Sequence, residues 1–295
     1  MWFIFTLITI VLWGGADLFY KLGSNEEDKT SHLKIVIFVG LAMGIHALGY
    51  MYIFSVDYQW INMLCYLPVS LLYILSMVVG YIGLRYIELS VASPIGNSSG
   101  AIAFILCFIF LKEAMTITQI AAVAVISLGI FLLAVIHRKN IDTEQSHGQA
   151  DESYRRGTLA ILFPVLYCII DGAGTFADAL VLDGVMDESQ ALISYELTFL
   201  LAAAAAFIYL TVVRKERIKL SKQKERIFAA VLETAGQFFY VRAMAANAIL
   251  AAPLVACYSI ASIVLSRIFL KERLSLKQYI IIAAVVAAIG ILGME

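Results

Sequence analysis

Acidic side chains occur inside long apolar stretches of this sequence, where carboxylates are unusual. Asp171 lies near the middle of one stretch, and Asp178 follows seven residues later on nearly the same helical face. Glu233 lies within another stretch, while Asp17 and Glu196 lie nearer the ends of theirs. A carboxylate in the middle of a membrane costs about 2.5–3.5 kcal/mol to insert, so it usually faces a wet cavity or a partner.

We expect Asp171 and Glu233 to act as charge partners or proton carriers. Asp17, Asp178 and Glu196 are further candidates for proton or ion coupling. The alternative for Asp17 and Asp178 is solvation near the headgroups, and for Glu196 it is capping or pairing near the interface. For Asp171 and Glu233 the alternative is a structural ion pair or hydrogen bond.

Basic partners for these acids are scarce in the apolar stretches. Arg242 lies nine residues after Glu233, which is about 13 Å along a helix and too far for an easy ion pair. A buried acid without a basic partner is either protonated or awaits a cation. This imbalance favours proton-coupled transport or cation binding.

Polar and aromatic groups accompany the acids at helical spacing. Glu233, Gln237 and Tyr240 are spaced i, i+4 and i+7 and share one face. We expect Gln237, Tyr240, Tyr258 and Asn97 to orient a substrate. Aromatic faces beside an acid hold alkylammonium groups, although most of the 35 aromatic residues must pack or face lipid. The candidate aromatic faces are Trp13, Tyr73 and Tyr167.

Catalytic and metal-binding patterns do not emerge. Residues 96–100 are glycine-rich but lack the strand context of a phosphate loop. His46 has no partner at i+4 that would make a metal site, and we interpret it as a helix-packing histidine bonded to a neighbour. The four cysteines lie in apolar runs, which indicates no disulfide framework. We expect no enzyme activity, no cofactor, no metal and no nucleic-acid partner.

The composition explains where these residues must lie. Of 295 residues, 62% are hydrophobic and 15% are charged, against about 25% charged in soluble domains. The mean hydropathy is +0.89. A soluble chain of this length cannot bury so much apolar surface, which predicts a multi-pass protein of the cell membrane.

Ten apolar segments follow one another, and lipid requires them to be helices because open strands would leave backbone groups unpaired. We expect segments one, three, four, six, eight and nine to line a cavity. The segments are 2–22, 33–54, 62–87, 91–111, 117–137, 158–180, 190–213, 227–246, 248–270 and 275–293.

The two halves of the chain repeat at an offset of 159 residues. The tetrapeptide Phe-Leu-Lys-Glu at 110–113 recurs at 269–272, and Pro94 matches Pro253. These prolines are candidate hinges. We expect a first five-helix repeat at 1–137, a polar linker at 138–157 and a second repeat at 158–295. Because five spans are an odd number, the second repeat enters the membrane upside down, as in secondary transporters.

These motifs resemble the drug/metabolite transporter superfamily, in particular its ten-span group with two EamA domains. The resemblance is carried by Ala92-Ser93-Pro94 with Leu111-Lys112-Glu113, and by Ala251-Ala252-Pro253 with Leu270-Lys271-Glu272. It covers nearly the whole chain. It implies an all-α membrane fold and transport, but not a substrate, because the superfamily carries sugars, amines, amino acids, nucleotide sugars and drugs.

Basic residues are distributed unevenly between the two sides of such a membrane protein. The loops and span ends on one side hold 19 of the 21 basic residues. The positive-inside rule therefore predicts that both termini lie outside. The family resemblance implies the reverse, with both termini in the cytoplasm.

We therefore expect a secondary active transporter of a small organic cation or amine-bearing metabolite. Its partners are a small-molecule substrate and the lipid bilayer, and the oligomeric state is open. One alternative is a neutral or zwitterionic solute, such as an amino acid or sugar, with the acids as proton relays. The other is a membrane scaffold that does not transport.

Overall fold

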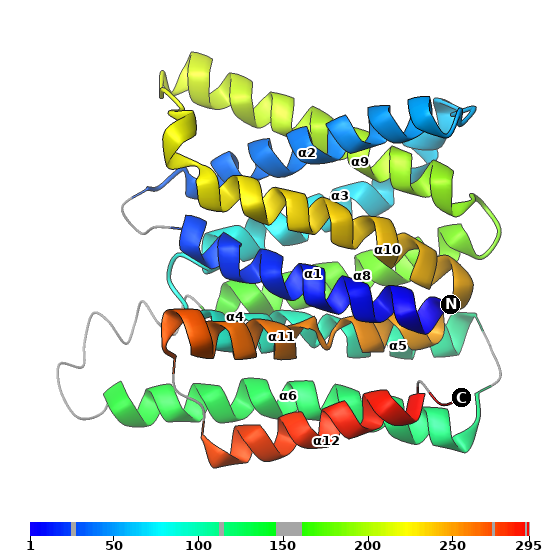
Figure 1. The fold of residues 1–295 in the computed structure, drawn as a ribbon, viewed down its shortest axis with the longest axis vertical. Helices are drawn as coiled ribbons and strands as arrows, with labels where there is room; N and C mark the ends of the chain where they lie inside the picture. Colours follow the sequence, from blue (N-terminus) through cyan, green and yellow to red (C-terminus); the bar gives the residue numbers. More distant parts are fainter. Residues whose placement is uncertain (25–27, 112–114, 146–160, 273–274, 293, 295) are drawn as a thin grey trace.

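The computed structural model describes residues 1–24, 28–111, 115–145, 161–272, 275–292 and 294. Nearly all of these residues are helical (Figure 1). The helices are α1 (Trp2–Gly23), α2 (Ser31–Ile53), α3 (Ile61–Gly83), α4 (Leu89–Asn97), α5 (Ser99–Phe110), α6 (Ile117–Gln145), α8 (Leu162–Leu182), α9 (Glu188–Ile208), α10 (Lys224–Val255), α11 (Tyr258–Leu265) and α12 (Leu276–Leu292). One π turn, Tyr209–Val213, follows α9, and another, Ser266–Leu270, follows α11.

Seven helical stretches among the described residues are long and apolar enough to cross a membrane. One joins α4 to α5, and another runs for 47 residues from Lys224 to Leu270. Two shorter apolar stretches, Ile117–Leu133 and Leu276–Leu292, accompany them. The helix ends lie within a few residues of the ten expected segments, except that α6 extends to Gln145, beyond residue 137.

The long stretch from α10 to α11 contains a sharp break at Asn247. Its backbone there is extended, with φ −166° and ψ 83°. The Asn247 side chain accepts a hydrogen bond from the backbone N–H of Leu250 at 3.1 Å, which is the geometry of a helix N-cap. The chain reverses direction near this point, so the second part of α10 and α11 run back along the bundle (Figure 1).

Two further interruptions follow prolines. The backbone between α4 and α5 breaks at Ser98, four residues after Pro94. The backbone between α10 and α11 breaks at Ala256 and Cys257, with Cys257 four residues after Pro253. Proline cannot donate a backbone hydrogen bond and bends the helix that contains it.

The helices pack in pairs that cross between the two halves of the chain. α1 packs on α10, α2 on α9, α3 on α8, and α6 on α12, while α4 packs on α11. Small residues permit the closest approaches. A Cβ at Gly40 of α2 would collide with the backbone oxygen of Phe199 in α9.

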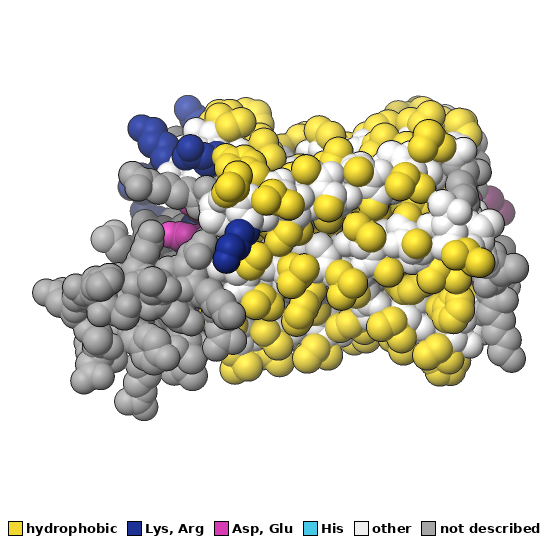
Figure 2. All heavy atoms as spheres, turned by 90° about the horizontal axis from the view of Figure 1, so that it is seen from below, with side chains coloured by type: hydrophobic (Ala, Val, Ile, Leu, Met, Phe, Trp, Pro, Cys, Tyr) yellow, Lys and Arg dark blue, Asp and Glu magenta, His cyan; other side chains and the backbone are white. Residues whose placement is uncertain are grey.

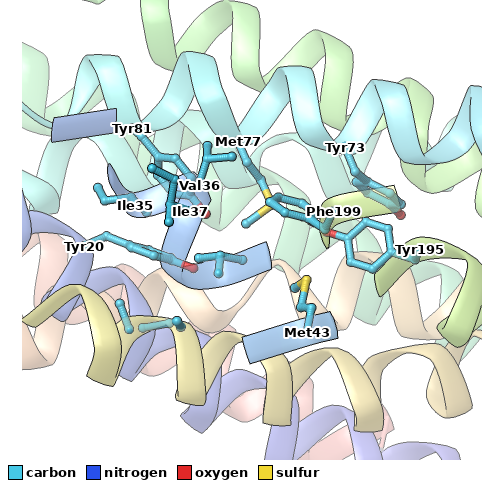
Figure 3. Packing of buried hydrophobic residues seen from close by; sticks show 14 of the residues in the cluster. Tyr20, Ile35, Val36, Ile37, Met43, Tyr73, Met77, Tyr81, Tyr195 and Phe199 are labelled. Atoms are coloured by element: carbon cyan, nitrogen blue, oxygen red, sulfur yellow. The ribbon is translucent and has the colours of Figure 1, made fainter. Parts of the chain in front are cut away.

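The interior is closely packed around large side chains from α1, α2, α3 and α9. Figure 3 shows Met77, Tyr195 and Phe199 together there, with Tyr20 and Tyr81 nearby. The rings of Tyr20 and Tyr81 are 4.7 Å apart between centroids. This core places several tyrosine hydroxyls deep in the bundle.

The outer surface is largely apolar along the length of the helices. Figure 2 shows hydrophobic side chains over the face that carries α6 and α12, with Lys and Arg gathered toward one end. Both chain termini lie at the opposite end (Figure 1). This is the surface that a lipid-embedded protein requires, with charge confined to the ends of the helices.

Candidate functional site

A cavity in the middle of the bundle collects the predicted site residues. It leaves about 110 Å³ for the centres of water-sized molecules, well above the roughly 10–15 Å³ that one water needs. Side chains from α1, α3, α4, α5, α8, α9, α10 and α11 line it. All nine predicted binding residues and one coupling candidate are among them: Trp13, Asp17, Tyr73, Asn97, Tyr167, Asp171, Glu233, Gln237, Tyr240 and Tyr258.

Asp171 occupies the wall that α8 contributes. The Ser99 hydroxyl, from the first turn of α5, donates to Asp171 Oδ2 at 2.8 Å. The Ser76 hydroxyl from α3 donates to Oδ1 at 3.4 Å. The carboxylate therefore links three helices through neutral donors, and no cationic side chain of the described residues forms an ion pair with it.

Asp17 lies on the α1 wall and also binds hydroxyl groups. Ser93 from α4 and Ser262 from α11 both donate to Asp17 Oδ2, each at 2.7 Å. These two donors come from opposite halves of the chain. A charge change at Asp17 would therefore act on both interrupted helices.

Glu233 lies on α10, which packs on α1, and is 7% exposed. The Trp13 indole N–H donates to the backbone oxygen of Glu233 at 3.2 Å. Gly236 allows this approach, because a Cβ there would collide with the Trp13 ring. Gln237 and Tyr240 continue the same face of α10 along the cavity.

Aromatic rings form much of the remaining wall. The Trp13 ring lies 4.9 Å from that of Tyr240 and 5.6 Å from that of Tyr258, between centroids. The hydroxyls of Tyr73 and Tyr240 are 2.7 Å apart, and those of Tyr167 and Tyr258 are 3.4 Å apart. Aromatic faces beside carboxylates suit the binding of ammonium groups.

The charged side chains that line the cavity, among the described residues, are all acidic. Three carboxylates, Asp17, Asp171 and Glu233, line it, whereas none of the described lining residues is Lys, Arg or His. A low-dielectric cleft of one charge sign concentrates counter-ions. The described residues contain no group of three or more His, Cys, Asp or Glu side chains placed to hold a metal ion.

Four other predicted residues do not line the cavity. Asp178 is fully buried, and the Tyr66 hydroxyl donates to its Oδ1 at 2.5 Å. Glu196 contacts His46 Nδ1 through both carboxylate oxygens at 2.8 Å. Pro94 and Pro253 lie inside α4 and α10, behind the lining residues.

Sequence reasoning missed two groups of residues in and around the cavity. Tyr20, Tyr81, Tyr195 and Met77 line it, and only Tyr20, three residues after Asp17, carried a spacing signal. The serines that hydrogen-bond to the acids were also missed. A serine in an apolar stretch carries no charge and no distinctive period, so the pattern gave no indication of its partner.

A family model of known proteins matches each half of the chain separately. The model of the EamA-like transporter family matches residues 1–135 and 159–294, which together make up most of the chain. The chain belongs to the EamA-like transporter family. This protein is therefore a multi-pass membrane transporter of small molecules.

A solved crystal structure shares the fold of this EamA-like transporter. It is 11% identical in sequence, with a TM-score of 0.64 over 96% of this chain and 97% of the other. At this identity the likeness concerns the fold alone. A search of curated proteins gave no match.

Proposed function

We propose that this EamA-like transporter is a secondary active carrier of small organic cations or amine-bearing metabolites in the cell membrane. One observation carries the proposal: three carboxylates and several aromatic faces line a cavity to which the described residues contribute no basic side chain. An anion would meet only repulsion there, whereas an ammonium group gains both carboxylate and aromatic contacts.

Proton coupling follows from competition for the same carboxylates. A buried carboxylate without a basic neighbour holds either a proton or a cation, because leaving its charge bare in a low-dielectric site is costly. Arrival of a substrate cation at Asp171 or Glu233 then releases a proton to the open side of the membrane. The proton gradient drives the cycle when this exchange alternates between the two sides.

The proposed architecture is ten membrane crossings in two inverted five-helix repeats. The break at Asn247 divides the 47-residue stretch into two crossings, and the shorter apolar stretches of α6 and α12 supply two more. The packing pairs support the symmetry. Exchanging equivalent spans of the two halves turns the α1–α10 pair into the α8–α3 pair and leaves the α2–α9, α4–α11 and α6–α12 pairs unchanged.

Alternating access fits this arrangement. The repeated tetrapeptides begin at the last residue of α5 and within the π turn after α11, which lie at opposite ends of the bundle (Figure 1). Lys112 and Glu113 lie outside the described residues. The interruptions at Ser98 and Cys257 are related by the same 159-residue offset and give each half a flexible point beside the cavity.

A second candidate is a neutral or zwitterionic solute with the acids acting only as proton relays. The serine hydroxyls favour it, because Ser93, Ser99 and Ser262 already satisfy oxygens of Asp17 and Asp171. In this version the substrate binds through Gln237, Asn97 and the tyrosines.

Reconstituted protein tests the proposal. Liposomes containing the purified transporter are offered labelled quaternary and primary amines, amino acids and sugars under an imposed proton gradient. We expect saturable amine uptake driven by the gradient. Uptake of only amino acids or sugars would establish the second candidate. No uptake of any of these solutes would indicate a scaffold that does not transport.

A further inference from the structure

A second hollow lies at the basic end of the molecule, away from the central cavity. It is formed by the connection between α1 and α2 and by the connection between α9 and α10. Its lining residues are Asp28, Lys34, Arg217, Lys219, Lys222, Gln223 and Arg226. This end contains the Lys and Arg side chains that gather beyond the apolar surface in Figure 2.

The inner wall of the hollow is an ion-pair network in which the charges balance. Lys34 Nζ lies 2.9 Å from Asp28 Oδ2 and 2.5 Å from Glu216 Oε1. Arg226 Nη2 lies 3.1 Å from Asp28 Oδ2. The Thr30 hydroxyl lies within hydrogen-bond distance of both acids, 2.9 Å from Asp28 Oδ1 and 2.8 Å from Glu216 Oε2. Two cations and two acids thus neutralise one another.

The outer wall carries cations that form no ion pair with the acids of this network. Arg217, Lys219 and Lys222 are exposed, and none of them makes an ion pair with another described residue. Among the described residues, the hollow and its ion-pair network therefore have a surplus of three positive charges. Such a surplus around an open hollow attracts an anion.

Arg226 is a further cation in the lining of the hollow. The residue is 7% exposed, and its guanidinium donates to Gln223 and to Asp28. Its Nε is buried and has no hydrogen-bond partner in the described part of the chain. Because this Nε is buried, Arg226 acts on an anion in the hollow through its charge, which the ion pair with Asp28 holds in place.

The position of the hollow indicates where such an anion comes from. Leu220 is 66% exposed between Lys219 and Lys222, and Val212 and Val213 at the end of the preceding helix are 66% and 64% exposed. Apolar side chains interleaved with lysines are typical of a segment that lies at a membrane surface. The basic loops are also those that the positive-inside rule assigns to the side rich in anionic lipid.

We propose that this hollow binds a phosphate group, as the headgroup of an anionic phospholipid or as a free phosphate. Arg217, Lys219 and Lys222 attract and contact the anion, and Arg226 lines the same hollow. The bound group would join the α1–α2 and α9–α10 connections, so that lipid composition regulates the stability of this end of the bundle.

The test compares two triple variants of the full-length protein in lipid nanodiscs. R217Q/K219Q/K222Q removes the surplus charges of the hollow. R214Q/K215Q/K224Q removes three charges from the same end but from residues that do not line the hollow. The Tm is measured in discs of phosphatidylcholine alone, in discs that also contain phosphatidylglycerol, and in phosphatidylcholine discs with added inorganic phosphate.

We expect the parent and the R214Q/K215Q/K224Q control to gain about 5 °C in Tm with the ligand present, and the hollow variant to gain none. A gain only with phosphatidylglycerol assigns the site to a lipid headgroup, and a gain with inorganic phosphate assigns it to free phosphate. The proposal would be overturned if both triple variants lost the Tm gain equally, or if the parent showed no Tm gain under any condition.

Discussion

Asp17 and Asp171 have hydroxyl partners in the cavity, and among the described residues neither forms an ion pair with a cation. Asp171 binds Ser99 and Ser76, and Asp17 binds Ser93 and Ser262. Neutral donors hold a carboxylate in place without cancelling its charge. Each acid therefore remains able to exchange a proton for a cation.

The first prediction concerns Asp171. Replacement by Asn keeps the shape and still accepts the hydrogen bond from Ser99, but removes the charge. We expect cation uptake to fall at least about tenfold, a loss of about 1.4 kcal/mol in binding, while the free energy of unfolding changes by less than about 1 kcal/mol. Uptake and thermal unfolding measure these two effects.

Asp183→Asn is the matched control for Asp171→Asn. Asp183 follows the same helix and is exposed, so its neutralisation should leave uptake unchanged. If Asp171→Asn instead unfolded the protein or left uptake at the parent level, Asp171 would be a structural residue.

The second prediction concerns the pH dependence that Glu233 contributes. If a proton and the substrate compete for this carboxylate, Glu233→Gln should flatten the dependence of substrate binding on pH. Glu225→Gln, at the exposed start of the same helix, should keep the parent profile. Identical profiles for the parent, Asp171→Asn and Glu233→Gln would transfer the coupling role to Asp17, Asp178 or Glu196.

At the scale of helices, Pro94 and Pro253 and the helix interruptions that follow them are the proposed hinges. Alternating access requires gates at both ends of the cavity. The third prediction is that Pro94→Ala and Pro253→Ala each slow transport several-fold and leave equilibrium binding intact. Pro68 also lies inside a helix, but α3 continues without interruption after it, so Pro68→Ala is the control. If Pro94→Ala and Pro253→Ala both transported at the parent rate, the two prolines would not be hinges.

The connections at the basic end give the fourth prediction, which concerns acid stability. Burial opposes ionisation of Asp28, but hydrogen bonds from Lys34 and Thr30 and the charges of Lys34 and Arg226 outweigh it and lower its pKa below 3.8. A hydrogen bond from Lys34 likewise lowers the pKa of Glu216 below 4.5. A depressed acid pKa contributes stability that is present above the unfolded-state pKa and is lost as the pH falls.

Lys34→Met should therefore destabilise the protein at pH 7 by about 1 kcal/mol and reduce the loss of stability below about pH 4.5. Thermal unfolding between pH 3 and pH 7 measures both effects. The matched change Lys29→Met removes a charge just before the same helix, from a residue outside the network. An acid profile of Lys34→Met that coincides with that of the parent would contradict this account.

The helices themselves were predictable from the sequence because lipid allows an isolated span no other form. The described helix ends lie close to the apolar segments for that reason. The break at Asn247 was also predictable, because the expected segments 227–246 and 248–270 meet at this residue. The far end of α6 was not, because a helix can continue into water beyond the apolar run.

Partners distant in sequence were the part of the site that could not be predicted. His46 and Glu196 are 150 residues apart, and their contact depends on how α2 and α9 pack. The clustering of Asp17, Asp171 and Glu233 likewise depends on three helices from both halves. Helical periodicity identifies the face of one helix but not the helix that it meets.

At the scale of the whole molecule, the arrangement of charge leads to a prediction about orientation. The basic connections lie at one end and both termini lie at the other (Figure 1). The positive-inside rule then places a tag attached after residue 295 on the outer side of the membrane. Labelling of the tag in intact cells checks this, and labelling only after permeabilisation would instead support the orientation that the family resemblance implies.

The central claim is that a substrate cation displaces a proton from the carboxylates of the cavity. Proton release in weakly buffered detergent solution, as choline and benzyltrimethylammonium are added across a series of pH values, tests it most directly. Uncharged analogues of the same shape are the controls. The account predicts release of up to about one proton per bound cation, none with the uncharged analogues, and none in Asp171→Asn/Glu233→Gln. Cation binding without proton release at any pH, or equal responses to charged and uncharged analogues, would contradict it.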